Sequence, residues 1–121
     1  RPRAPEDLAR HNCLSLGQQR GWTLKVDGEP TTFKVGGKLE CNDGAVLREW
    51  ALAGRGLTWR SWWEVGEDVA AGRLVTVLDD YAAMPVGIFA VFPERRHLPL
   101  RVRAFVDLLR SRYARPGYWG P

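Results

Sequence analysis

Few residues of this sequence have types and spacing that could do chemistry, and the clearest are Asn42-Asp43. Apolar residues at helical spacing follow this pair and end at Gly54, which predicts a helix that begins there. The first N–H groups of a helix lack partners within it and carry partial positive charge, so they can bind a carboxylate or a phosphate. Asn and Asp are also common helix caps, and Asp43 would repel an anion. We favour capping, with an anion site as its alternative.

Six tryptophans provide a second set of candidate binding residues. Trp50 and Trp62 fall on the apolar faces of expected helices and are predicted to lie in the core. Trp22, Trp59 and Trp63 lie at the edges of expected elements, where aromatic rings can line a ligand cleft. Packing in the core is the competing interpretation for these three.

The other reactive side chains form no recognisable catalytic or metal-binding pattern. Cys13 and Cys41 have no metal-ligand spacing and are expected to be buried thiols of a reducing compartment. His11 and His97 share no motif, and we interpret Asp79-Asp80 as a solvated turn rather than a catalytic pair. The sequence therefore predicts no enzyme, no metal site and no cofactor.

Charge and hydropathy limit the classes of partner. The net charge is +4, and seven arginines fall between residues 95 and 115, where they alternate with an apolar helical stripe. Basic clusters can contact nucleic acid, but no recognition motif accompanies this one, so direct DNA binding by the chain is not expected. No run is long enough to cross a membrane and no signal peptide is evident, so we expect a cytoplasmic protein.

Short β-type runs alternate with amphipathic helical patterns along the chain. Strands are predicted at residues 13–16, 22–26, 32–41 with a break at Gly36-Gly37, 56–59, 74–78 and 86–92. Helices are predicted after Asn42-Asp43, after the capping-box pattern of Ser61 and Glu64, and over residues 100–113. This order predicts an α/β fold with a mostly parallel sheet flanked by helices, and loose ends at residues 1–6 and 115–121.

Several stretches, in this order, resemble the effector-binding domain of LysR-type transcription regulators. They are Pro5-Glu6-Asp7-Leu8 with His11-Asn12-Cys13-Leu14, Asn42-Asp43-Gly44-Ala45-Val46, Leu52-Ala53-Gly54-Arg55-Gly56-Leu57, Ala71-Gly72-Arg73-Leu74, and the ending from Ala90 to Leu109. The resemblance implies a periplasmic-binding-protein-like (type 2) fold. Within it, residues 8–85 would be the second regulatory subdomain, 86–92 a returning hinge strand, and 100–113 a helix of the first subdomain. The chain would then be a fragment without its winged helix-turn-helix.

The resemblance further implies a ligand sensor without catalysis, which binds a small effector, often an organic acid, between two subdomains. The cleft positions carried over are Trp22, Asn42, Asp43, Trp59, Arg60, Ser61, Val86 and Ile88. Arg60 stands in a loop that often bears proline in the family, and it is the candidate carboxylate partner. DNA would be contacted only by the missing domain. No membrane partner is implied, and a second copy of the chain is expected to cover the apolar stripe of the 100–113 helix.

A solute-binding protein or a small α/β enzyme of similar architecture is the alternative to a regulator. A solute-binding protein would need an export signal, and an enzyme would need a nucleophile or base in a cleft. A winged helix-turn-helix encoded upstream would decide in favour of the regulator.

Overall fold

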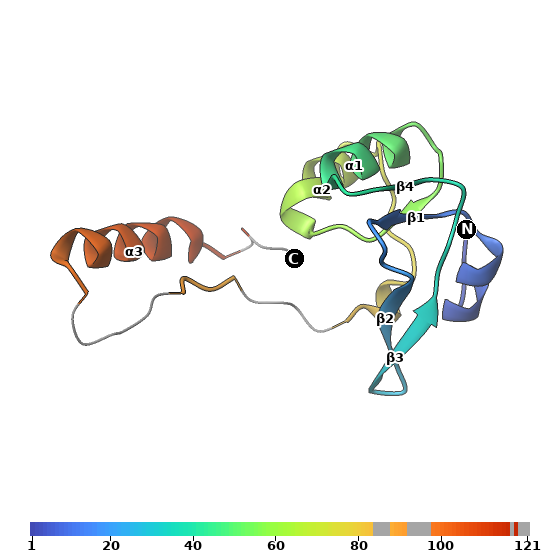
Figure 1. Cartoon of the computed structure of the whole chain (residues 1–121), viewed down its shortest axis with the longest axis horizontal. Coiled ribbons are helices and arrows are strands. Elements are labelled where there is room, and N and C mark those ends of the chain that lie inside the picture. Colours follow the sequence, from blue (N-terminus) through green and yellow to red (C-terminus); the bar gives the residue numbers. More distant parts are fainter. Residues whose placement is uncertain (84–87, 92–97, 117, 119–121) are drawn as a thin grey trace. The chain divides into compact units, whose positions relative to one another are not determined.

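The computed structural model describes residues 1–83, 88–91, 98–116 and 118, and the chain forms two compact units, residues 1–84 and 85–121 (Figure 1). The first unit contains, in chain order, the short 3₁₀ helix η1 (Pro5–Arg10), β1 (Cys13–Leu16), β2 (Gly21–Val26), β3 (Glu29–Lys34), β4 (Glu40–Cys41), α1 (Gly44–Leu52), β5 (Leu57–Thr58), α2 (Trp62–Ala70) and the 3₁₀ turn η2 (Asp79–Tyr81). The second unit contains α3 (Leu100–Tyr113).

A three-stranded parallel sheet in the order β4-β1-β5 organises the first unit. β1 lies in the middle and pairs Leu16 with Cys41 on one side and Leu14 with Thr58 on the other. α1 packs against all three strands, and Figure 1 shows α1 and α2 together beside the sheet. The parallel sheet with flanking helices confirms the expected α/β class.

The antiparallel hairpin β2-β3 is built by its turn. Asp27 and Gly28 both have positive φ, 50° and 86°, which matches the right-handed twist of a two-residue hairpin turn. One face of β2 enters the core of the unit while β3 is largely exposed. The core cluster consists of Leu8, Cys13, Trp22, Leu24 and Val35. The hairpin therefore closes the core rather than extending the parallel sheet.

Asn12 joins three segments at the amino end of the sheet. Its Oδ1 accepts the Lys38 N–H at 2.8 Å, and its Nδ2 donates to the Arg55 carbonyl at 2.6 Å. A Cβ at Gly37 would overlap the amide oxygen of Asn12, and a Cβ at Gly56 would overlap its backbone carbonyl oxygen, so both connecting loops need glycine to approach Asn12 this closely. Asn12 therefore has a structural role, far from the carboxyl ends of the strands.

Two predicted strands are absent from the described chain. Residues 74–78 run without regular structure from α2 to η2, and Val75 is exposed. Residues 88–91, the described part of the predicted 86–92 strand, also form no strand, whereas Val86 lies outside the described residues. Both segments are rich in β-branched or aromatic residues, but a strand also requires a neighbour that completes its ladder of hydrogen bonds.

The helix predicted over residues 100–113 is confirmed as α3. Of its apolar stripe, Val102, Val106 and Leu109 are half-buried and Phe105 is exposed. The helix therefore forms by local pattern and lies in the second unit with much of its apolar surface uncovered.

The N-terminal segment is ordered, contrary to the expectation of a loose end. Pro2, Pro5 and Leu8 are buried, and the Asp7 carboxylate holds the turn before η1. Its Oδ2 accepts the N–H groups of Arg3 at 2.8 Å and Ala4 at 3.2 Å, while Oδ1 accepts from the Arg10 guanidinium at 2.5 Å. Buried apolar side chains and one shared carboxylate thus fix the segment.

These hydrogen bonds give the N-terminal turn a defined pH dependence. The Arg3 N–H, then the Arg10 side chain and the Ala4 N–H, lower the pKa of Asp7 from 3.8 to about 2. Because the folded pKa lies below the unfolded one, the stabilisation is complete above pH 3.8 and disappears as the pH falls through about 2. Thermal melting of the wild type and Asp7→Asn should differ at neutral pH and converge towards pH 2, with Glu6→Gln as the control. A difference that does not change with pH would contradict this role.

Candidate functional site

The carboxyl ends of three parallel strands bring most of the predicted site residues to one edge of the sheet. β1 ends at Leu16, β4 ends at Cys41 directly before Asn42-Asp43, and β5 ends at Thr58 directly before Trp59. The Gly17 N–H donates to the Cys41 carbonyl at 2.6 Å and ties the first two ends together. In α/β sheets, ligands bind beside the carboxyl ends of the strands, so this edge is the candidate functional site.

Asp43 caps α1, as the favoured interpretation predicts. Its backbone is extended, and its Oδ1 accepts the Ala45 N–H at 2.9 Å. The carboxylate therefore uses a donor that an anion at this helix start would need. Asn42 beside it is exposed.

Arg60 reaches from the end of β5 to the first turn of α1. A Cβ placed on Gly44 would overlap the Arg60 guanidinium, so Gly44 admits the arginine where any other residue would displace it. The guanidinium thereby adds a full positive charge beside a helix start that already carries partial positive charge. The structure therefore brings Arg60 close to Gly44 at the start of α1, next to Asn42 and Asp43.

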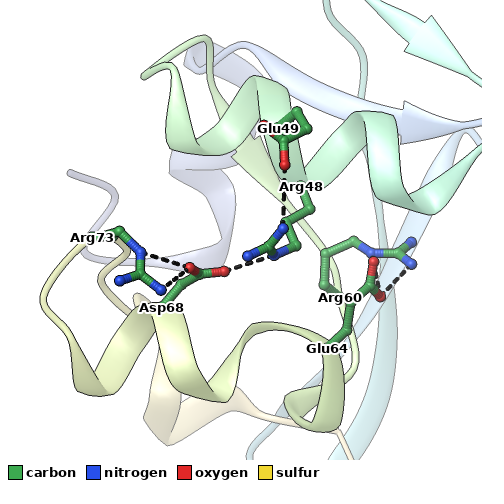
Figure 2. A network of polar contacts seen from close by, with 6 residues as sticks. All are labelled: Arg48, Glu49, Arg60, Glu64, Asp68 and Arg73. Atoms are coloured by element: carbon green, nitrogen blue, oxygen red, sulfur yellow. Dashed lines mark hydrogen bonds and ion pairs between the residues drawn. The ribbon is translucent and has the colours of Figure 1, made fainter.

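Glu64 neutralises this arginine. Arg60 donates from Nε at 3.0 Å and from Nη2 at 2.5 Å to the same oxygen, Oε2 of Glu64 (Figure 2). The capping-box prediction is therefore only half right: Ser61 is the N-cap residue of α2, but its side chain makes no capping hydrogen bond. Glu64 turns to Arg60 because a charged pair of hydrogen bonds is stronger than one to a neutral N–H.

Two tryptophans meet at the same edge in different environments. The ring centroids of Trp22 and Trp59 are 6.2 Å apart, and the rings are tilted by 48°. Trp22 is buried in the core cluster and contacts Trp59 there, so it does not line a cleft, whereas 41% of Trp59 is exposed. Trp63 is exposed, and Trp50 and Trp62 are half-buried at the positions expected to be core.

Val86 and Ile88 are the two predicted hinge positions. Val86 lies outside the described residues, and Ile88 is an exposed residue of the second unit.

A second charged cluster holds α1 to α2 (Figure 2). The buried Asp68 accepts from Arg48 Nε at 2.6 Å on Oδ2 and from Arg73 Nε at 2.8 Å on Oδ1. The hydrogen bond from Arg48, followed by that from Arg73, lowers the pKa of Asp68, and the bond to Asp68 raises the pKa of Arg48. All of these groups have partners, so the cluster positions the two helices.

The cysteines show no sign of reactivity. Cys13 and Cys41 are free thiols, the first buried and the second half-buried. Burial raises the pKa of Cys13, and the thiolate is the nucleophilic form, so this thiol is poorly suited to covalent chemistry. Within the described residues, no three His, Cys, Asp or Glu side chains gather in a way that could hold a metal ion. The helices of that part are also too short or too polar to cross a membrane.

Comparison with known families identifies the fold that carries this edge. The sequence profile of the family described as "LysR substrate binding domain" matches residues 1–114. The chain belongs to this family. The resemblance noted in the sequence is thereby confirmed, and so is the LysR substrate-binding fold with its parallel sheet flanked by helices.

Curated relatives of this LysR-family chain are transcription regulators. The chain is 35% identical over 117 residues to the HTH-type transcriptional regulator DmlR of Escherichia coli (strain K12), covering 93% of the chain and 38% of DmlR. It is 34% identical over 114 residues to the HTH-type transcriptional activator TtdR of the same strain, covering 91% of the chain and 36% of TtdR. The chain thus spans less than two fifths of the length of these relatives.

Solved structures lead to the same family. The regulatory domain of AphB from Vibrio vulnificus matches with a TM-score of 0.74 and 31% identity, over 92% of the chain and 56% of that structure. Full-length AphB of Vibrio cholerae, described as a virulence activator of the LTTR family, matches with a TM-score of 0.78 and 27% identity. This match covers 92% of the chain and 39% of the full-length AphB structure.

Two residues near this edge were not predicted from the sequence: Glu64, which pairs with Arg60, and Asp68, which joins α2 to α1. The capping-box pattern favours Glu64 as part of the cap of α2, but Glu64 also lies only four residues after Arg60, close enough for an ion pair at the start of that helix. Asp68 lies three residues after Val65, on the apolar side of the predicted helix. Because a charged residue on such a face is usually paired when it is buried, its position indicates a buried ion pair.

Proposed function

We propose that this chain is the effector-sensing part of a LysR-type transcription regulator, and that a small organic acid binds at the carboxyl edge of the β4-β1-β5 sheet. Arg60 would bind the carboxylate, and the exposed face of Trp59 would contact the rest of the molecule. Asn42 and Ser61, both exposed at the same strand ends, would supply further hydrogen bonds.

The observation that carries this proposal is the position of Arg60. Its guanidinium lies against Gly44 in the first turn of α1, and its side chain is only 16% exposed. A guanidinium has five N–H donors in a planar arrangement that matches a carboxylate, and Glu64 receives only two of them. A half-buried arginine at the carboxyl edge of a parallel sheet favours a carboxylate over a neutral or cationic effector.

The remainder of the regulator is also part of the proposal. We infer that residues 8–85 form the second regulatory subdomain, that 86–92 return as a hinge strand, and that 100–113 belong to the first subdomain. Residues 86–92 would then gain a ladder partner, and α3 a cover for its apolar stripe, from that subdomain or from a second copy. DNA would be read by a separate winged helix-turn-helix of a cytoplasmic oligomer.

Substitution of Arg60 tests the proposal in the full-length regulator. A panel of mono- and dicarboxylic acids is titrated while tryptophan fluorescence and the melting temperature are followed. Arg60→Gln should weaken binding of the responding acid by about 10-fold to 100-fold, which corresponds to the loss of a charged hydrogen bond. Arg55→Gln removes the same charge at the opposite, amino edge of the sheet and should leave the affinity unchanged. If both variants bind equally well, the site lies elsewhere.

A further inference from the structure

We propose that Glu64 is an internal competitor of the effector: its carboxylate occupies the donors of Arg60 in the free protein, and an acidic ligand must displace it. Glu64 would thus set both the affinity and the charge specificity of the site. This inference rests on the proposed function, because it concerns the same arginine.

The geometry of the ion pair supports displacement rather than a permanent bridge. Arg60 Nε and Nη2 converge on Oε2 alone, so the pair lacks the two parallel hydrogen bonds of a bidentate arginine–carboxylate contact. A ligand carboxylate that takes both donors, one on each oxygen, can therefore form a better contact than Glu64 does. Both side chains are still partly accessible, Arg60 at 16% and Glu64 at 14%, so the exchange requires no unfolding.

The surroundings of the pair show why Glu64 and not another acid fills this role. Asp43, the nearest acidic residue in the chain to Gly44, is directed to the Ala45 N–H and caps α1. Asp68, one turn after Glu64 on α2, is held by Arg48 and Arg73 in the separate cluster of Figure 2. The Glu64 side chain makes hydrogen bonds only to Arg60 in the described part of the chain, so its release breaks no other side-chain hydrogen bond, although its charge also acts on Arg48.

The consequence is a specificity rule for the site. When a ligand displaces Glu64, Arg60 loses the negative charge that pairs with it. An anionic ligand replaces that charge, whereas a neutral ligand leaves the guanidinium unpaired. Removal of the Glu64 charge should therefore increase the affinity for anions, although most substitutions in a binding site reduce it. An ion pair that only fastens the start of α2 does not predict such a gain.

The test compares three charge changes in the 121-residue chain, with sodium succinate as the probe and sodium chloride at equal ionic strength as the blank. Binding is followed through the arginine Nε–H signals in ¹⁵N NMR spectra. Glu64→Gln should bind succinate about 10-fold more tightly than the wild type, the value of one charged hydrogen bond. Glu49→Gln removes the same charge from an exposed residue that pairs with Arg48 at 3.2 Å, and should leave the affinity unchanged. Arg60→Gln should weaken succinate binding by about 10-fold to 100-fold.

The outcomes separate this inference from the proposed function. If the wild type and Glu64→Gln bind succinate equally and Arg60→Gln binds it more weakly than either, the site stands and the competitor role is wrong. If no variant shows a response that depends on Arg60, the site and the competitor role both fail. Glu64→Ala provides a second way to remove the charge, because alanine preserves helix α2. A gain of affinity in both Glu64 variants but not in Glu49→Gln would establish the competitor.

Discussion

Replacing Leu47 with alanine is expected to lower the free energy of unfolding by about 2–5 kcal/mol, the usual range for removing a fully buried leucine side chain. Leu47 is the buried residue of α1 and is 1% exposed, and this helix packs against all three strands of the parallel sheet. The cavity would lie between α1 and the sheet. The substitution would therefore weaken the packing of the helix that begins at Asp43 and Gly44. Urea denaturation followed by circular dichroism measures the change.

Leu100→Ala is the matched control, because it is the same substitution at the start of another helix where the side chain is 80% exposed. Its effect on the free energy of unfolding should stay within about 0.5 kcal/mol. Equal losses in the two variants would mean that α1 is not held to the sheet through Leu47.

The second large effect concerns the buried carboxylate between α1 and α2. The double variant Arg48→Ala/Arg73→Ala should lower the melting temperature by about 10 °C or more, because it leaves a buried charge without a partner. Asp68 is 1% exposed, whereas the side chains of Arg48 and Arg73 are 31% and 55% exposed. Each single arginine variant leaves Asp68 one partner, so the double loss should exceed the sum of the two single losses.

A rescue distinguishes this electrostatic cause from lost packing. Adding Asp68→Asn to the double variant removes the unpaired charge while preserving the shape of the side chain, and should recover part of the melting temperature. Glu49→Ala removes only the exposed neighbour of Arg48 and should change the melting temperature by no more than about 2 °C. If the triple variant melts no higher than the double variant, the arginines act through their aliphatic stems and not through their charge.

Local features of the fold were predictable from the sequence because their causes lie within a few residues. Three local features depend on the backbone preferences of the residues themselves: the Asp27-Gly28 turn, the cap of α1 by Asp43, and the termination of α1 before Gly54, which has a φ of +70°. The alternation of strands and helices likewise predicted the parallel sheet, and that sheet places Asn42 and Trp59 at one edge through the shared direction of its strands.

The sequence by itself therefore determined the family, the class of fold and the edge at which Arg60 lies. The tertiary structure alone decided which partner each side chain takes there. Glu64 could cap α2 or pair with Arg60, and residues 74–78 had the composition of a strand, so in both cases local preference allowed two states. The choice depended on contacts between distant segments: a guanidinium held against Gly44 attracts Glu64, and a segment without a ladder partner forms no strand.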